Sequence, residues 1–282
     1  MLVSERAHAK INLALQITGR RKDGYHELDS IVAFANVADV LTIAPATDVS
    51  LDITGPFSGD LPRDNRNSVV AAWHLLNDFL RQKGAALAPA KFLLEKNLPV
   101  ASGIGGGSAD AAAALRGLIR LFDISISAQN LNGIALQLGA DVPICLVQKT
   151  SRMRGAGEMI APFSTNLPSG MVLVNPLIPL PTLKVFDALS LDRGQSLGAI
   201  IGDLNDFRCW RNDLTAPAIK IVPEIANILE SLNSQSGIAC ARMSGSGATC
   251  FGLTENFERA ELAATAISAK HPGWWVAATT LV

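Results

Sequence analysis

The sequence predicts a protein of the α+β class with two domains, and three observations lead to that prediction. In residues 7–17 apolar and polar side chains alternate, which is typical of a strand. Residues 98–121 run through a glycine-rich loop into an alanine-rich helix, whereas residues 171–182 run from a strand into a proline-rich segment. Because the two halves are built differently, we expect an N-terminal domain over residues 1–163 and a C-terminal domain over 164–282, with ligands between them.

The rest of the first half follows from spacing and end signals. We expect a turn at Asp23–Gly24 and then an extended segment over 28–34. A helix over 67–81, capped by Asn67 and Ser68, a strand over 91–94 and a helix over 127–138 should follow. Asp141 and Pro143 come next. The proline predicts an extended backbone at Val142, because a residue before proline is disfavoured in the helical region.

The second half is expected to begin with a strand over 171–174, followed by a helix over 219–232, two strands joined by the small-residue turn Met243–Ala248, a helix over 255–270 and a closing strand over 275–282. The turn is itself rich in glycine. It could approach a phosphate or simply connect the two strands.

Composition excludes several classes of protein. Of the 282 residues, 49% are hydrophobic and 17% are charged, which is the balance of a folded chain and not of a disordered one. The formal net charge of −1 offers no overall attraction to nucleic acid or to a membrane, and we expect neither as a partner, nor an obligate protein partner. The charged first ten residues do not resemble a signal peptide, so we expect a cytoplasmic protein. The histidines are dispersed, and we assign no side chain as a metal ligand.

The stretch LPVASGIGGGSADAA, residues 98–112, raises the question of what comes so close to its backbone. A glycine-rich turn before a helix leaves N–H groups unpaired at the positive end of the helix dipole, which suits a phosphate. The stretch is not a Walker-type loop, because no lysine follows the glycines. It is not a dinucleotide fingerprint either, because Ser108 stands where that fingerprint has Gly or Ala. Two interpretations remain: an anion-binding loop, which we favour, and a helix cap packed tightly on a sheet.

Other positions carry side chains suited to chemistry, and each has a plainer alternative. Lys10 shares a strand face with Asn12 and matters if that face lines a cleft, whereas on a solvated face it is an ordinary strand lysine. Asp141 lies near an element end, where sites are often built, or it is a simple cap. Tyr25 and His26 could stack on a flat ligand and hydrogen-bond its edge, or they belong to a surface turn.

Three phosphate-compatible segments in this order, PVASGIGGGSADAA, ADVP and MSGSGA, resemble those of the GHMP small-molecule kinases, the family of galactokinase, homoserine kinase and mevalonate kinase. The resemblance covers essentially the whole chain. AKINL and DGYHEL are similar to the branch that phosphorylates the 2-hydroxyl of a cytidylyl-linked methylerythritol, in the non-mevalonate route to isoprenoid precursors. Ser102 and Ile104 depart mildly from the usual loop, and Thr215 replaces an acidic residue often found after Asn212–Asp213.

The resemblance implies a two-domain fold with the active site in the cleft between the domains, and ATP carried with Mg²⁺ as the phosphate donor. The loop residues that wrap the triphosphate are then Pro99, Val100, Ala101, Ser102, Gly103, Ile104, Gly105, Gly106, Gly107, Ser108 and Ala109. Asn67 and Lys96 correspond to positions that shape the adenine pocket.

The resemblance also assigns the acceptor side. The substrate positions are Asn12, Tyr25, His26, Thr182 and Phe186, where Tyr25 and Phe186 sandwich cytosine and His26 bonds its edge. Lys10 corresponds to the residue near the transferred phosphate. We assign Asp141 as the general base that takes the proton of the acceptor hydroxyl.

Two other functions stay open from sequence. One is a different GHMP kinase, of the sugar, homoserine or mevalonate type, and the aromatic set of Tyr25, His26 and Phe186 disfavours it. The other is an inactive nucleotide-binding homologue, which the presence of Lys10 and Asp141 disfavours.

Overall fold

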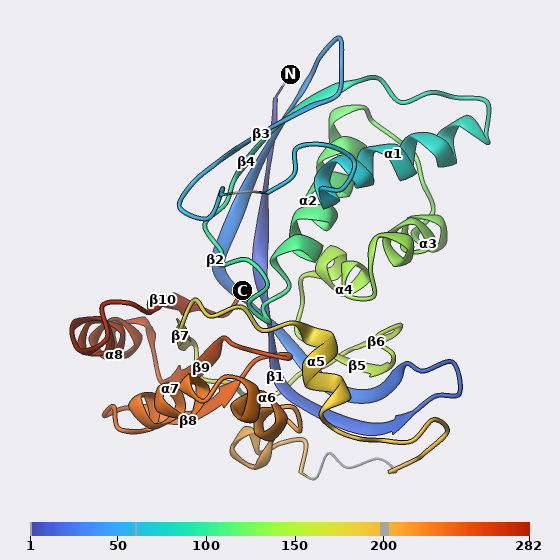
Figure 1. Ribbon diagram of the computed structural model, residues 1–282. Coiled ribbons are helices and arrows are strands. Elements are labelled where there is room, and N and C mark those ends of the chain that lie inside the picture. The colour runs from blue at the N-terminus through green and yellow to red at the C-terminus, as the bar shows by residue number, and fades with distance from the viewer. Residues whose placement is uncertain (1, 60, 198–202) are drawn as a thin grey trace. The chain divides into compact units, whose positions relative to one another are not determined.

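The computed structural model describes residues 2–59, 61–197 and 203–282 (Figure 1). The chain forms two compact units, each assembled from separate stretches. Unit 1 consists of Met1–Ala9, Ala38–Val100 and Gly105–Gln148, and unit 2 of Lys10–Val37, Ala101–Ile104 and Lys149–Val282. Strands β1 (Val3–Arg20) and β2 (His26–Pro45) pair with each other and contribute residues to both units. The units follow contacts and not chain order, so the domain boundary between residues 163 and 164 stays a prediction.

Unit 1 is a small sheet with helices packed against it (Figure 1). Strands β3 (Ser50–Thr54) and β4 (Ala90–Glu95) are parallel, and β4 pairs antiparallel with residues 40–45 of β2. Four helices pack with one another: α1 (Ser68–Arg81), α2 (Gly106–Leu121), α3 (Ala128–Leu138) and α4 (Val142–Val147). Gly117 allows α2 to approach the sheet, because a Cβ there would lie 2.4 Å from Cδ1 of Ile43.

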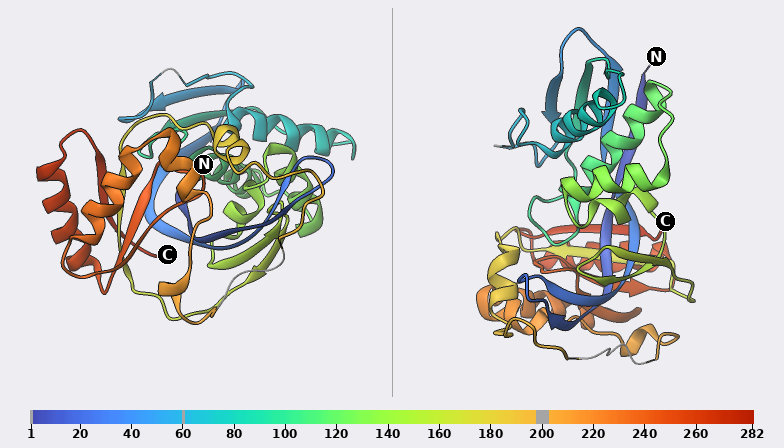
Figure 2. Two further views of the ribbon diagram at one scale, coloured as in Figure 1. Left: turned by 60° about the horizontal axis from the view of Figure 1, so that its bottom comes forward. Right: turned by 90° about the vertical axis from the view of Figure 1, so that its right-hand side faces the viewer.

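Unit 2 contains a four-stranded antiparallel sheet in the order β10–β7–β9–β8. Its strands are β7 (Gly170–Asn175), β8 (Ile238–Met243), β9 (Cys250–Thr254) and β10 (Trp275–Thr280). Helices α7 (Glu224–Asn233) and α8 (Phe257–Lys270) pack on this sheet (Figure 2). Val174, Ile228 and Ile267 are buried in one apolar cluster between the helices and the strands.

The remaining elements of unit 2 are short. Strands β5 (Ser151–Gly155) and β6 (Met159–Pro162) continue a sheet from residues 28–32 of β2. Two helices, α5 (Thr182–Asp187) and α6 (Thr215–Ile221), and the 3₁₀ turn η1 (Phe207–Cys209) lie in the long connection between β7 and α7.

Most expected elements are confirmed. The predicted helices over 67–81, 127–138 and 255–270 correspond to α1, α3 and α8, and Asn67 is the residue that caps α1. The predicted strands over 91–94 and 171–174 correspond to β4 and β7, and the turn at Met243–Ala248 joins β8 to β9. These are the segments in which a clear apolar period ends at a capping residue or a glycine.

Two local expectations are wrong, and both involve proline. Val142 is helical and not extended, because Pro143 lies in the first turn of α4, where a missing N–H costs nothing. The single helix expected over 219–232 is two helices, α6 and α7, which are separated at Val222 and Pro223. The polar face of β1 is also not solvated, since Lys10, Asn12 and Gln16 are all buried.

Asn212 connects three segments of unit 2 at the start of α6. Its Nδ2 donates to the carbonyl oxygens of Met243 and Gly245, at 2.8 Å each, and its Oδ1 accepts from the backbone N–H of Leu214 at 2.9 Å. The neighbouring Asp213 accepts from the N–H of Ile17 in β1 at 2.9 Å. The side chain of Asn212 is buried, so these partners have no water to replace it.

We expect Asn212→Ala to lower the free energy of unfolding by about 2–4 kcal/mol, because it leaves two buried carbonyls and one N–H unpaired and each such group costs about 1–3 kcal/mol before relaxation. Chemical denaturation measures this loss. The matched control is Asn227→Ala in α7, an exposed asparagine bonded to Glu224, which should change the free energy by less than about 0.5 kcal/mol. Equal losses in the two variants would contradict the connecting role of Asn212.

Candidate active site

The glycine-rich loop has a backbone suited to an anion. Ala101, Gly103 and Gly105 adopt left-handed φ values of 51°, 78° and 66°, and they alternate with residues of ordinary φ. Such alternation turns successive N–H groups toward one concave side, which is the geometry of an anion-binding nest. Helix α2 begins directly after the loop, with Gly105 as its cap. The first-turn N–H groups have no acceptor within the helix, and they stand at the positive end of its dipole.

Each glycine of the loop has its own reason to lack a side chain. A Cβ at Gly103 would lie 2.6 Å from the carbonyl oxygen of Gly247, and one at Gly106 would lie 3.2 Å from Nζ of Lys96. Gly107 lies within α2, and its φ is not left-handed. A Cβ at this position would meet no atom of the described residues within 4 Å outside the helix's own nearby backbone. Neither packing nor backbone strain explains Gly107, which is an exposed residue in the first turn of α2.

The turn Met243–Ala248 packs against the glycine loop within unit 2. Ser244 donates its hydroxyl to the carbonyl oxygen of Gly103 at 3.1 Å and accepts from the N–H of Asn12, also at 3.1 Å. The N–H of Thr249 donates to the carbonyl oxygen of Ser102 at 3.1 Å. The turn therefore connects two strands and also supports the loop, a role that its small residues alone did not predict.

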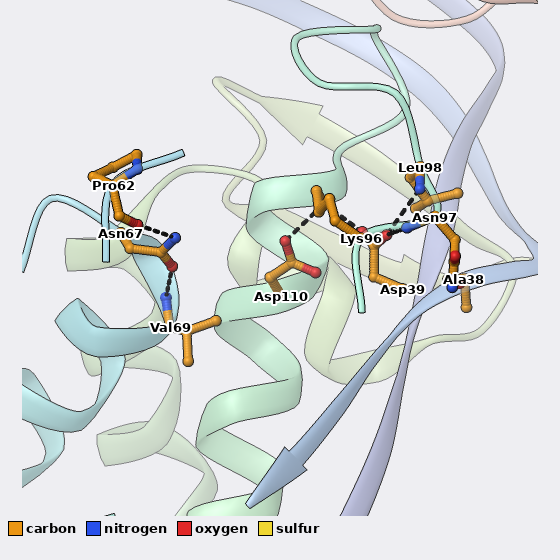
Figure 3. A network of polar contacts seen from close by, with 9 residues as sticks. All are labelled: Ala38, Asp39, Pro62, Asn67, Val69, Lys96, Asn97, Leu98 and Asp110. Carbon is orange, nitrogen blue, oxygen red and sulfur yellow. Dashed lines mark hydrogen bonds and ion pairs between the residues drawn. The ribbon is translucent and has the colours of Figure 1, made fainter. Parts of the chain in front are cut away.

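Lys96 is buried at the end of β4, and its ammonium group is enclosed by two carboxylates (Figure 3). Nζ donates to Oδ2 of Asp39 and, at 2.8 Å, to Oδ2 of Asp110 in α2. The other oxygen of Asp39 accepts from the N–H groups of Asn97 and Leu98 at 2.6 and 2.8 Å. The Lys96 side chain is thus committed to this cluster.

Burial and charge act against each other in this cluster. Burial lowers the pKa of Lys96, but Asp110 and Asp39 outweigh it and the pKa is raised. Burial raises the pKa of Asp110 to about 7, and the charge of Asp39 adds to that rise while Lys96 opposes it. When Asp110 takes up a proton near neutral pH, the cluster of two carboxyl groups and one ammonium group has no net charge.

The side chain of Asn67 caps the N-terminus of α1 (Figure 3). Its Oδ1 accepts from the N–H of Val69 at 3.0 Å, and its Nδ2 donates to the carbonyl oxygen of Pro62 at 2.9 Å. The side chain expected near adenine is therefore already engaged in a helix cap.

Lys10 and Asp141 lie on separate elements, each in its own unit. Lys10 is a buried residue of β1 in unit 2, and its N–H donates to the carbonyl oxygen of Ile104 in the glycine loop at 2.9 Å. Asp141 precedes α4 in unit 1 and is half-exposed. The assignment of this pair to the reacting groups stays a prediction.

All five expected substrate residues lie in unit 2. The rings of His26 and Phe186 are in contact, with centroids 4.9 Å apart and a tilt of 36°. The hydroxyl of Thr182 lies 2.9 Å from that of Ser246, and Tyr25 is 65% exposed in the β1–β2 turn. The structure therefore brings His26 and Phe186 together.

Among the buried polar atoms of unit 2 without a hydrogen-bond partner in the described residues, three belong to β1 and the start of β2, and a fourth, Oγ of Ser231, lies in α7. The three are Oδ1 of Asn12, Oε1 of Gln16 and Nε2 of His26. Such orphans are costly in a folded core, and they are typical of sites that a ligand or water completes. Burial and the charge of Arg20 lower the pKa of His26, which keeps its ring neutral at pH 7. Gln16 lies on the polar face of β1 that the alternation predicts, but no sequence motif assigned it to the site.

Asp39 and Asp110 are also absent from the sequence-based assignment. Asp110 did carry a signal, because it is a charged residue in an otherwise apolar helix start, where a buried charge requires a partner. No motif pointed to Asp39.

Metal and membrane features are few. Among the described residues, no group of three or more His, Cys, Asp or Glu side chains could hold a metal ion. None of the described helices combines the length and apolar character that a membrane span requires.

Comparison with known proteins defines the class. The family model of the GHMP kinases N terminal domain matches residues 67–149, and that of the GHMP kinases C terminal domain matches residues 186–273. The fold resembles a homoserine kinase from Cytophaga hutchinsonii with a TM-score of 0.71, at 16% identity over 99% of this chain and 95% of that one. The chain thus has the two-domain fold of the GHMP kinases, which use ATP.

More similar relatives narrow the family. A 4-diphosphocytidyl-2-C-methyl-D-erythritol kinase of Paramagnetospirillum magneticum is 45% identical over 98% of this chain and 97% of its own, and one of Cereibacter sphaeroides is 47% identical over 98% of each. A solved 4-(cytidine 5'-diphospho)-2C-methyl-D-erythritol kinase has a TM-score of 0.79 at 32% identity, over 99% of both chains. This chain belongs to the 4-diphosphocytidyl-2-C-methyl-D-erythritol kinase family.

We expect Gly103→Ala to lower the free energy of unfolding by about 1–3 kcal/mol, because it adds a Cβ against two backbone oxygens at a left-handed φ. Gly133→Ala is the matched control, since Gly133 lies inside α3 and no atom of the described residues comes within 4 Å of the place that the added methyl group would take. That substitution should raise the free energy by up to about 1 kcal/mol. Urea denaturation of both variants is the measurement, and the same sign for both would contradict the close contact of the loop and the turn.

Proposed function

We propose that this chain transfers the γ-phosphate of ATP to the 2-hydroxyl of 4-diphosphocytidyl-2-C-methyl-D-erythritol, as a cytoplasmic step of the non-mevalonate route to isoprenoid precursors. The observation that supports ATP binding is the glycine loop, in which left-handed residues alternate with ordinary ones directly before the first turn of α2. The choice of phosphate acceptor is supported by family membership, at 45–47% identity over nearly the full length.

Within the loop Pro99–Ala109, the backbone N–H groups of residues 100–108 are offered to the triphosphate, because Pro99 has no N–H and that of Ala109 donates to the carbonyl oxygen of Gly105. Backbone donors carry no formal charge, so the phosphates need a cation as well. Mg²⁺ fits this requirement, because a nucleotide-bound magnesium takes most of its ligands from phosphate and water. Asp39 and Asp110 are buried against Lys96, so neither carboxylate is offered to the ion. When bound, Mg²⁺ would neutralise charge on the phosphates, and no side chain of this chain is assigned to hold it.

The acceptor hydroxyl has to lose a proton as its bond to phosphorus forms. Asp141 takes that proton, and Lys10 stabilises the charge on the γ-phosphate and on the forming alkoxide. Phosphoryl transfer through a loose transition state otherwise asks the protein chiefly to position the two substrates.

The cytidylyl group binds in unit 2. Tyr25 and Phe186 flank the base, and the neutral ring of His26 bonds its edge. Two observations support this side: Nε2 of His26 and Oδ1 of Asn12 are buried without partners among the described residues, and His26 already contacts Phe186. Thr182, which begins α5 beside Ser246, completes the set.

ATP consumption with and without the cytidylyl substrate tests the proposed function. A kinase of this specificity consumes ATP only when that substrate is present. Turnover with a sugar, homoserine or mevalonate in its place would assign a different GHMP kinase, and no turnover with any of them would assign an inactive nucleotide-binding homologue.

We expect Asp141→Asn to lower kcat by about 10²–10⁴, the usual effect of removing a general base, while both substrates still bind. Lys10→Ala should have a similar effect, and the double variant should fall well short of the summed losses, because the two residues act as a unit. The measurement is the single-turnover rate with both substrates saturating.

Asp78→Asn is the matched control for this experiment. Asp78 is an exposed aspartate of α1 outside the proposed site, and its substitution should leave the rate unchanged. A rate for Asp141→Asn within a few-fold of the parent would remove Asp141 from the mechanism and leave positioning, with Lys10 as the main electrostatic contributor.

We expect His26→Ala and Tyr25→Ala to raise the KM for the cytidylyl substrate by about ten- to a hundred-fold, since a buried hydrogen bond or a stacking partner is worth roughly 1–3 kcal/mol. The KM for ATP should not change. Steady-state kinetics with each substrate varied in turn separates the two values. Leu183→Ala, at a highly exposed position of α5, is the control that should change neither. Equal losses for both substrates would indicate a collapsed turn instead of a lost contact.

A further inference from the structure

We propose that Asp39, Lys96 and Asp110 form a positioning cluster for the nucleotide, which holds the two ends of the glycine loop in the geometry that takes the triphosphate. The proposal rests on the proposed function, in which the loop binds ATP. In this proposal Asp39 and Asp110 help to position ATP for the reaction. Lys96 does not touch the nucleotide, and it affects ATP binding by fixing the backbone of the loop.

The cluster fixes the chain just before the loop. Oδ1 of Asp39 accepts from the N–H groups of Asn97 and Leu98, at 2.6 and 2.8 Å, which sets the backbone that enters the loop at Pro99. The backbone of Lys96 is held as well, since its N–H donates to Thr54 at 2.8 Å and its carbonyl accepts from Phe57 at 3.1 Å. The backbone of Lys96 is therefore fixed, and its side chain can move toward a ligand only by breaking the bonds of Nζ to Asp39 and Asp110.

The same ammonium group fixes the chain just after the loop. Nζ of Lys96 donates to Oδ2 of Asp110 at 2.8 Å, and Asp110 lies near the start of α2 (Figure 3). Gly106 permits this approach, because a Cβ there would lie only 3.2 Å from Nζ. The cluster thus holds both ends of the loop: Asp39 bonds the chain that enters it, and Lys96 links Asp39 to Asp110 at the start of α2.

Stability alone does not account for this cluster. A buried ion pair is weak evidence for stability, because the cost of removing charges from water can exceed their attraction. This cluster also has two carboxylates for one ammonium, and Oδ1 of Asp110 is buried with no hydrogen-bond partner in the described part of the chain. Apolar residues would fill the same space at less electrostatic cost. A fixed geometry at the loop ends is what the charged groups provide in their place.

The test compares four variants with the parent by direct binding of ATP and by steady-state kinetics. Lys96→Met removes both contacts of Nζ, and Asp110→Leu removes only the one to α2. Asp110→Asn keeps an acceptor for Lys96, and the triple variant D39N/K96M/D110N removes every charge at once. Glu5→Gln is the control, because Glu5 pairs with Arg116 and Arg120 of the same helix at a distance from its start.

We expect Lys96→Met, Asp110→Leu and the triple variant to weaken ATP binding about tenfold or more, in line with the effect of an ångström-scale misplacement at an active site. The KM for the cytidylyl substrate should stay within about twofold, because that substrate binds elsewhere. Asp110→Asn and Glu5→Gln should bind ATP within about threefold of the parent. The triple variant is decisive, because it leaves no unpaired charge buried in the cluster. Urea denaturation establishes that it is folded, and its ATP binding should still be weakened.

A pH profile gives a second readout that a merely structural role does not move. Asp110 faces Lys96 from β4 and Asp39 from β2, and with a pKa of about 7 it gains a negative charge between pH 6 and pH 8. The added negative charge lies near the helix start that is proposed to hold the phosphates, and it repels them. The ATP affinity of the parent should therefore fall over that range relative to Asp110→Asn, which cannot ionise. Parallel profiles would contradict the proposal.

Normal ATP binding by a folded triple variant would overturn the proposal outright. If Lys96→Met fails to fold, because it leaves two carboxylates facing each other, the triple variant and the pH profile still decide. Failure of the proposed function looks different: the parent would bind ATP but not phosphorylate the cytidylyl substrate, and ATP binding by the variants would still test the cluster.

Discussion

A buried ammonium group has to be surrounded by acceptors, and that requirement organises the centre of unit 1. Lys96 meets it only because Asp39 from β2 and Asp110 from α2 reach the end of β4. Asp39 then has an oxygen left over, which the N–H groups of Asn97 and Leu98 satisfy. A single electrostatic requirement thereby helps to fix the path of the chain into the glycine loop and the start of α2, and it leaves little room at Gly106, where a Cβ would lie 3.2 Å from Nζ of Lys96. The path of the glycine loop is a consequence of this arrangement as much as of its glycines.

Close packing accounts for only some glycines of the glycine-rich stretch, and anion binding stays the proposal for the loop as a whole. Gly103 is required by packing, because the carbonyl oxygens of Ser244 and Gly247 occupy the place of a side chain. Gly105 is required by its left-handed backbone, and Gly107 by neither. This loop has little freedom to change its residues at two positions, because backbone oxygens exclude a Cβ at Gly103 and a left-handed φ disfavours one at Gly105. This is why a stretch whose glycines suggest flexibility is built as a fixed surface.

Sequence reasoning succeeded where a local rule sufficed and failed where distant charges meet. The caps of α1 and α3, the strands around Met243–Ala248 and the helix α8 each follow from a nearby period and its end signal. The resemblance located the loop and the family. Both wrong expectations lie at a proline, Pro143 at the start of α4 and Pro223 before α7. The position of a proline within a helix turn decides whether it ends a helix or begins one. The partners of Lys96 lay beyond reach for another reason: Asp39 is separated from it by 57 positions, and no local pattern links the two.

The charge of the whole chain explains why so much of the candidate site is backbone. Both proposed ligands are polyanions, yet the formal net charge is −1 and two carboxylates are buried beside the loop. Attraction at long range is therefore absent, and recognition has to come from donors fixed at short range. Oriented N–H groups and the start of α2 meet this need without adding formal charge that repels or recruits other partners. In such a site each true cation counts, so the backbone bond from Lys10 of β1 to Ile104 matters, because it fixes a cationic residue to the loop that carries these dipoles.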